Sequence, residues 1–159
     1  MIISEYTIPG MHIRDHVLSV PLDWSDPSSK AIEFFAREVV DPVRKNEALP
    51  VLCFLQGGPG GKSPRPTRGG PSWLAQALKT HRVILPDQRG TGRSTPVDTA
   101  MIGELDGEAG GDYLACFRAD SIIKDLEHFR KTVLGGRRWQ TLGQSYGGFL
   151  TFTYLSQAP

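Results

Sequence analysis

Short stretches of apolar and β-branched residues recur along the chain and predict the strands of a sheet. The first two, residues 17–24 and 32–40, mix apolar with polar positions and are rich in β-branched or aromatic residues. The turn signal Ser25-Asp26-Pro27 separates them. This pattern predicts an antiparallel strand pair at one edge of the sheet.

Three further stretches, residues 51–55, 83–85 and 139–142, are shorter and stop abruptly at a glycine or a proline. Short apolar runs bounded by turns are typical of strands that are buried on both faces. In parallel sheets both faces are covered by helices, so the side chains on both faces of such strands are apolar. These three stretches therefore predict parallel strands in the interior of the sheet.

Helical patterns fill the intervals around these strands. Apolar residues at helical spacing occupy three segments, residues 72–78, 120–133 and 149–155. Ser72 and Asp120 are the expected N-caps of the first two helices, and Gly135-Gly136 is expected to end the second. The alternation of strand and helix predicts βαβ units.

The segment 96–112 fits neither period. Its acidic residues are scattered among glycines, which predicts a long, mobile surface loop. The fold class expected from the whole pattern is α/β, with a mostly parallel sheet and an antiparallel strand pair at its N-terminal side.

Composition narrows the possible functions. The 159 residues allow one modest domain, and 39% hydrophobic with 22% charged residues is typical of a globular protein. A net charge of +1 gives no indication of a nucleic acid or a membrane surface as partner. The sequence contains no run of eighteen apolar residues and no apolar leader segment. We therefore expect neither a nucleic acid nor a membrane as partner.

Cysteine usage indicates the compartment. Cys53 and Cys116 lie in or beside apolar stretches, so we expect buried free thiols, as in a reducing compartment. Neither has metal-ligand spacing with the four histidines, and we expect no metal and no cofactor. Together these features indicate a cytoplasmic protein.

The first motif with chemical content is Gly143-Gln144-Ser145-Tyr146-Gly147, which matches G-x-S-x-G. It follows a predicted strand and opens a predicted helix, the context of a nucleophile elbow. The two glycines let strand and helix approach, and the serine is exposed at the positive end of the helix. Ser145 is therefore the candidate nucleophile, and the Tyr146 N–H a candidate oxyanion donor. A chance Gly/Ser turn is the alternative interpretation.

The second motif is the loop Gln56-Gly57-Gly58-Pro59, continued by two more glycines after the strand 51–55. In an α/β-hydrolase the loop after this strand supplies the other oxyanion donor. Glycines allow the backbone to approach a substrate carbonyl, and proline fixes the loop shape. We expect the donor to be the N–H of Gly58, with Gly57 as the alternative.

The same loop has a competing interpretation. Gly61-Lys62-Ser63 is similar to the end of a phosphate-binding P-loop, G-x-x-x-x-G-K-[ST]. That motif requires a glycine at the position of Gln56. Pro59 also removes an N–H from a loop that binds phosphate through N–H groups. Nucleotide binding is therefore the minority hypothesis, and it leaves the serine elbow unexplained.

The third motif, DQRGTGRS, begins at Asp87 directly after the strand 83–85. We expect Asp87 and Arg89 to form a buried pair that shapes this loop. A catalytic role for Asp87 is disfavoured, because the triad acid of an α/β-hydrolase follows the serine in chain order.

Taken together, the GGPG loop, the DQRGTGRS segment and the GQSYGG elbow resemble those of proline iminopeptidases (prolyl aminopeptidases) in order and spacing. This family is the serine-peptidase branch of the α/β-hydrolases. Segments 117–125 and 153–156 look like the larger members, in which the first loop position is Gln, as Gln56 is here. The resemblance covers residues 14–159. It implies an α/β-hydrolase fold and release of N-terminal proline from peptides.

One departure from the family pattern concerns the catalytic triad. The family has an Asp and a His after the serine, whereas residues 146–159 contain no Asp, Glu or His. The chain is therefore interpreted as the N-terminal part, residues 1–159, of the catalytic domain. The family's cap domain and C-terminal catalytic part are then absent, and this chain alone is expected to be inactive.

The resemblance implies two partners, a peptide substrate with a free N-terminus and the C-terminal remainder of the protein. Two other functions remain open. One is an esterase or amidase on the same scaffold, because a fold does not fix the substrate. The other is a catalytically inactive fragment that acts as a binding module.

Overall fold

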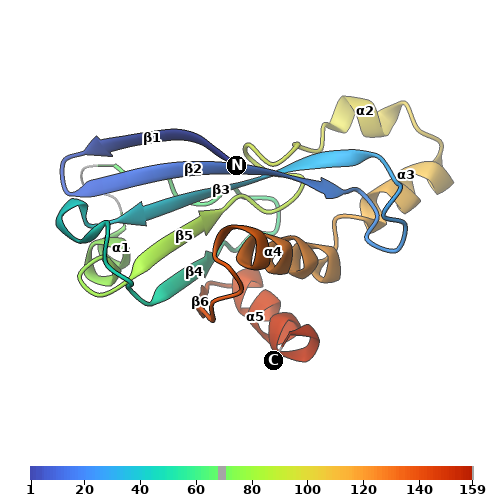
Figure 1. Cartoon of the computed structure of the whole chain (residues 1–159). Coiled ribbons are helices and arrows are strands. Elements are labelled where there is room, and N and C mark those ends of the chain that lie inside the picture. Colours follow the sequence, from blue (N-terminus) through green and yellow to red (C-terminus); the bar gives the residue numbers. More distant parts are fainter. Residues whose placement is uncertain (68–70, 159) are drawn as a thin grey trace.

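The computed structural model describes residues 1–67 and 71–158, which form one mixed sheet with helices on both faces (Figure 1). The strands are β1 (Ile2–Ile8), β2 (Met11–Pro21), β3 (Ala31–Val40), β4 (Val51–Leu55), β5 (Arg82–Pro86) and β6 (Gln140–Gly143). The helices are the short 3-10 turn η1 (Pro42–Arg44), α1 (Ser72–Ala77), α2 (Thr99–Gly103), α3 (Gly107–Ala115), α4 (Ala119–Val133) and α5 (Tyr146–Gln157).

The strand order is β1-β2-β3-β5-β4-β6. The pairs from β1 to β5 are antiparallel, and β5, β4 and β6 are parallel to one another. The α/β class and the antiparallel pair formed by β2 and β3 are confirmed. β1 was not expected from the sequence, and it adds a third antiparallel pair to the described sheet.

Each face of the sheet carries its own apolar core. α4 and α5 cover one face, where Ile122, Leu126 and Phe129 of α4 are buried. Their spacing of three and four residues places them on one side of the helix, which is why the sequence predicted α4. α1 covers the opposite face through Leu74 and Leu78. The central parallel strands β4 and β5 are thus covered on both faces, as a buried parallel sheet requires.

The helix ends differ partly from the expectation. Neither Ser72 nor Asp120 is an N-cap: α1 begins after Pro71 and α4 after Arg118, both without a side-chain cap. Asp120 lies inside the first turn of α4, where a carboxylate is favoured by the helix dipole without capping. The glycine stop of α4 is confirmed, because the Gly136 N–H donates to the Arg130 carbonyl at 3.0 Å.

The prediction of a surface loop over residues 96–112 is wrong, because α2 and α3 occupy most of this segment. Both helices are capped by carboxylates: Asp98 accepts from the Ala100 N–H at 2.9 Å and Asp106 from the Ala109 N–H at 2.8 Å. These short helices have few buried positions, so their sequence lacks an apolar period. The side-chain caps stabilise the helices in place of apolar burial.

In the part of the chain that the structure describes, no helix has the length and apolar character needed to cross a membrane. Cys53 and Cys116 are free thiols. Cys53 is fully buried and its burial raises the pKa of the thiol, whereas Cys116 is partly exposed. The expectation of two buried thiols therefore holds for Cys53 only.

Candidate active site

Ser145 lies in the sharp turn between β6 and α5. Its φ of 53° and ψ of −119° make it the one non-glycine residue with positive φ in residues 1–67 and 71–158. A side chain disfavours this conformation, and such strained residues cluster at active sites. The Ser145 side chain makes no capping hydrogen bond to α5. The hydroxyl therefore does not cap α5 and is available for another interaction.

The turn depends on close approach between α5 and β4. A Cβ built on Gly147 would overlap the carbonyl oxygen of Leu55, the last residue of β4. One built on Gly143 would overlap the carbonyl of Gly147. The two glycines that flank the serine in the motif thus lie where no side chain fits, as the elbow interpretation of the sequence requires.

The Gly-rich loop and the serine turn meet at one edge of the sheet. Leu55 and Gly143 are paired in the parallel ladder, so the loops that follow them begin side by side. A Cβ built on Gly57 would lie 3.0 Å from the Cβ of Ser145 and 2.6 Å from the carbonyl oxygen of Gln144. The structure therefore brings Gly57 against the candidate nucleophile, and Gly58 is the next residue of the same loop. That the N–H of Gly58, or alternatively that of Gly57, donates to an oxyanion stays a prediction.

Tyr146 is the first residue of α5, so its N–H is one of the unpaired donors at the helix N-terminus. Its ring stacks on Phe149, with centroids 5.6 Å apart. Burial raises the pKa of the Tyr146 hydroxyl. The phenol therefore stays neutral near pH 7 and is no source of negative charge beside Ser145.

The expected pair between Asp87 and Arg89 is not formed. The buried Asp87 carboxylate instead accepts two bonds from Arg65, at 2.9 and 2.6 Å, and two from the backbone N–H groups of Ser63 and Arg93, at 3.1 and 2.8 Å. Asp87 faces the continuation of the Gly-rich loop, which supplies Ser63 and Arg65, whereas Arg93 belongs to the loop that Asp87 itself opens. It fixes both loops to each other and has no acceptor site left for a catalytic proton.

Arg89 faces α4 instead. Its guanidinium donates to both carboxylate oxygens of Asp125, at 2.7 and 2.6 Å, and neither side chain is exposed. It also donates to the carbonyls of Pro21, Leu22 and Cys116. Sequence reasoning missed Asp125 as a partner. The available signal was a carboxylate at a buried position of an otherwise apolar helix face.

The buried loop serine argues against the P-loop interpretation. Ser63 donates its N–H to Asp87 and its hydroxyl to the Pro86 carbonyl. In a P-loop this hydroxyl would bind Mg²⁺. Here it ties the Gly-rich loop to the end of β5.

None of the four histidines of the described chain is hydrogen-bonded to Ser145. Each has another neighbour: His12 bonds Glu5, His16 bonds Glu38, His81 bonds Thr80, and His128 packs against Trp24. Nor do three or more His, Cys, Asp or Glu side chains within residues 1–67 and 71–158 gather as they would around a metal ion. The described part of the site consists of a candidate nucleophile and candidate N–H donors.

One cavity adjoins the site, and a second lies at the opposite edge of the sheet. The first, called the elbow cavity, has a volume of about 260 Å³ and is lined in part by Pro59, Gly60 and Tyr146. Its lining also contains Leu114 and Phe117, from the end of α3 and the residues that follow it. It therefore lies beside the residues that flank the nucleophile.

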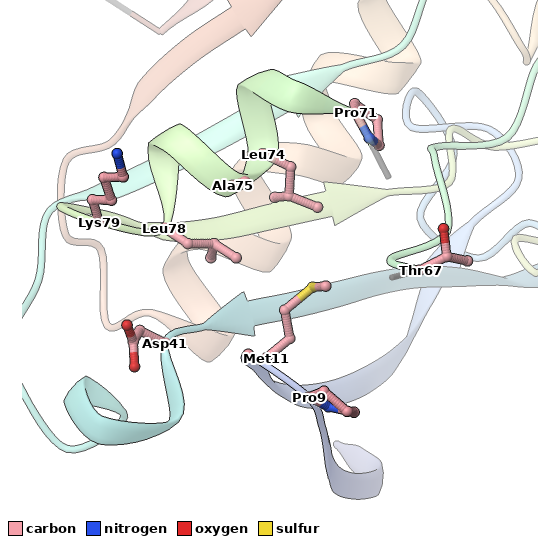
Figure 2. Close-up of a pocket in the computed structure, with 10 residues that line it drawn as sticks. Pro9, Met11, Asp41, Thr67, Pro71, Leu74, Ala75, Leu78 and Lys79 are labelled. Atoms are coloured by element: carbon pink, nitrogen blue, oxygen red, sulfur yellow. The ribbon is translucent and has the colours of Figure 1, made fainter. Parts of the chain in front are cut away.

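The second cavity, of about 330 Å³, lies between α1 and the β1–β2 turn. Figure 2 shows Leu74, Leu78 and Met11 pointing into the same space. Met11 lies at the start of β2, next to the end of β3, and that edge of the sheet is opposite to the one that carries Ser145. The lining of this cavity is mostly apolar, with Asp41, Thr67 and Lys79 as its polar residues, and it does not include Ser145.

Sequence comparisons agree with this geometry. The proline iminopeptidase of Aeromonas sobria is 43% identical over 155 residues, which are 97% of this chain and 36% of that protein. Proline iminopeptidase aneH of Aspergillus aculeatus is 34% identical over 148 residues, 88% of this chain and 33% of that protein. The resemblance seen in the three motifs is thereby confirmed. The chain spans about a third of the length of these two relatives.

The fold is found in solved structures as well. Homoserine O-acetyltransferase from Staphylococcus aureus superimposes with a TM-score of 0.63 at 13% identity, over 92% of this chain and 43% of that one. At this identity the likeness concerns the fold alone. Residues 50–159 match the family described as alpha/beta hydrolase fold. With the serine elbow at the expected strand–helix turn, this match shows that the chain belongs to the α/β-hydrolase fold family.

Proposed function

We propose that this chain carries the nucleophile of a serine aminopeptidase that releases N-terminal proline, or a similar residue, from peptides. The observation that carries the proposal is Ser145, which is held at positive φ between a parallel strand and a helix N-terminus, with the Gly-rich loop against it. The two proline iminopeptidases that resemble the chain support the choice of a peptide substrate.

In this mechanism the Ser145 hydroxyl attacks the carbonyl carbon of the N-terminal residue while a base takes its proton. The N–H groups of Tyr146 and Gly58, or Gly57 in place of Gly58, stabilise the negative charge on the carbonyl oxygen. The C–N bond breaks, and the departing amine takes the proton from the base. Water then hydrolyses the acyl-enzyme and regenerates the serine.

The base and its partner acid are proposed to come from a part of the protein outside residues 1–159. The surface around the elbow supports a further segment there. Within the described sheet β6 pairs only with β4, so its other edge is unpaired. On α5, next to this edge, Phe149, Phe152 and Leu155 are 58%, 75% and 60% exposed. Apolar side chains in such a group are typical of a covered surface.

The test uses the complete natural polypeptide that contains residues 1–159. It is expected to hydrolyse proline arylamide, and Ser145→Ala is expected to lower kcat by about 10³-fold or more. Ser156→Ala, on the exposed end of the same helix, is the matched control and keeps the activity. Proline arylamide with a blocked amine should be a poor substrate. Equal hydrolysis of blocked and free substrates would instead favour an esterase or general amidase.

The chain of residues 1–159 alone is proposed to be inactive, because a serine without a base within reach is a weak nucleophile. Proline arylamide turnover by this chain, lost on Ser145→Ala, would show that a base exists within it. Catalysis would then need no further segment.

A further inference from the structure

We propose that the elbow cavity is the subsite for the apolar side chain of the substrate's N-terminal residue, and that Leu114 and Phe117 set its size. This inference rests on the proposed aminopeptidase function. It assigns a specificity role to the segment that joins β5 to α4, which lies before the nucleophile in the chain.

The position of the cavity follows from the strand order. Ser145 follows β6, the Gly-rich loop follows β4, and Gln88 follows β5, which lies beyond β4 in the sheet. The cavity is bounded by Gly60, Gln88 and Tyr146, so it opens on the β5 side of the nucleophile. Figure 1 shows α2 and α3 beyond the sheet, on the side toward which β4 and β5 point.

The cavity lies on one side of Ser145, and this position decides whether the acyl part or the departing amine of the substrate enters it. A base must reach both the serine and the departing amine. Among the described residues no His, Asp or Glu lines the cavity, and Asp87, which follows β5, is held by four donors. The unpaired edge of β6 is the open side. The departing amine therefore lies toward β6, and the acyl side chain lies toward the cavity.

The chemistry of the walls fits an apolar group. Val97, Leu114, Phe117 and Ile122 form the apolar part of the lining, and its polar residues Gln88, Arg89 and Thr91 include no carboxylate. A positively charged N-terminal amine finds no opposite charge in it, so the amine must be recognised outside it. A volume of about 260 Å³ is below the usual range for whole drug-sized ligands and suits one side chain.

The wall at Phe117 is held in place. A Cβ built on Gly90 would lie 2.8 Å from Cδ1 of Phe117, so this ring rests directly on the loop after β5. Tyr113 packs on the same ring with centroids 5.0 Å apart, and Arg89 donates to the carbonyl of Cys116 at 2.6 Å. A wall fixed from three directions can discriminate by size, because it does not yield to a larger group.

The experiment compares the complete natural polypeptide with variants of two exposed leucines. Leu114, 45% exposed, lines the cavity, whereas Leu105, 39% exposed, lies on the same segment and does not. Leu114→Trp should fill the cavity and lower the ratio of kcat/KM for proline arylamide to that for glycine arylamide by about tenfold or more. Leu114→Ala should raise kcat/KM for phenylalanine arylamide relative to proline arylamide.

Leu105→Trp is the control and should leave both ratios unchanged. If Leu114→Trp and Leu114→Ala leave the ratios unchanged while the unsubstituted protein is active, the subsite assignment is overturned and the proposed function stands. If the unsubstituted protein hydrolyses no aminoacyl arylamide, the proposed function fails and this inference fails with it.

Discussion

Gly147 and Gly148 are neighbours in the first turn of α5, yet an added methyl group would meet very different surroundings. At Gly147 it would overlap the Leu55 carbonyl, whereas at Gly148 nothing lies within 4 Å. Gly147→Ala should therefore push α5 away from β4, move Ser145, and lower the midpoint of thermal unfolding. Gly148→Ala should be neutral or stabilising by up to about 1 kcal/mol, because alanine favours a helix.

Differential scanning calorimetry of the two variants, together with arylamide turnover by the complete polypeptide, checks this prediction. Equal midpoints for Gly147→Ala and Gly148→Ala would contradict the close approach of α5 to β4.

Asp87 and Arg89 show how far single residues can be predicted from the sequence. That both lie just after a buried strand is observed as predicted, since the apolar run and the turn that ends it are local signals. Their partners, Arg65 and Asp125, depend on how a loop and a helix pack in space. No local pattern carries that information.

At the scale of elements, one polar cluster joins the two helices that cover the same face. Glu127 on α4 accepts two bonds from Arg130, at 2.6 and 2.8 Å, and one from the hydroxyl of Tyr154 on α5. Trp139, just before β6, donates to the same hydroxyl at 3.0 Å. The hydrogen bonds from Arg130 are the main cause that lowers the pKa of Glu127 to about 2.

The stability that this carboxylate provides should depend on pH. Because its pKa in the folded state lies below the ordinary 4.5, the contribution is fully present above about pH 4.5 and is lost as the pH falls toward 2. Glu127→Gln should lower the free energy of unfolding by about 1 kcal/mol at pH 7, a modest value because the cluster is partly exposed to water.

Urea unfolding of both proteins at several pH values between 7 and 2.5 measures this difference, with the exposed Glu104→Gln as a control for the loss of a carboxylate. A difference that stays constant over this range would contradict the role of the Glu127 cluster.

The predictability of the elements follows their burial. β4 was predicted with its observed bounds, because both its faces are covered and its sequence is a continuous apolar run. β1 was missed because most of its residues are exposed, so no apolar period marks it. α2 was missed for the same reason. Partial exposure removes the signal on which sequence reasoning depends.

At the scale of the whole molecule, the outer surface of α5 and the unpaired edge of β6 should make residues 1–159 self-associate when expressed alone. Phe152 and Leu155 form the most exposed part of this surface. The double variant Phe152→Lys and Leu155→Glu should shift the chain toward the monomer. Val43→Lys, which removes an exposed apolar residue on η1, should not.

Size-exclusion chromatography with light scattering distinguishes the two outcomes. A monomeric chain at tens of micromolar, the range in which exposed apolar surface drives association, would show that this surface needs no cover.

The location of the candidate site was predictable at this scale, because the carboxyl ends of parallel strands meet at one edge. Ser145 and Gly58 therefore lie on neighbouring loops, as the motifs indicated. The elbow cavity was not predictable, because Leu114 in its lining belongs to α3, a helix that the sequence did not predict.

The backbone angle of Ser145 implies that this residue holds a conformation that opposes the stability of the fold. A side chain at φ 53° is strained, and glycine at this position is not. Ser145→Gly should therefore be more stable than Ser145→Ala by about 1 kcal/mol, although both lack the nucleophile. Equal stability in urea unfolding would show an unstrained turn. If the difference is found, the proposed nucleophile is an example of stability given up for activity, and a search for stabilising substitutions alone would remove it.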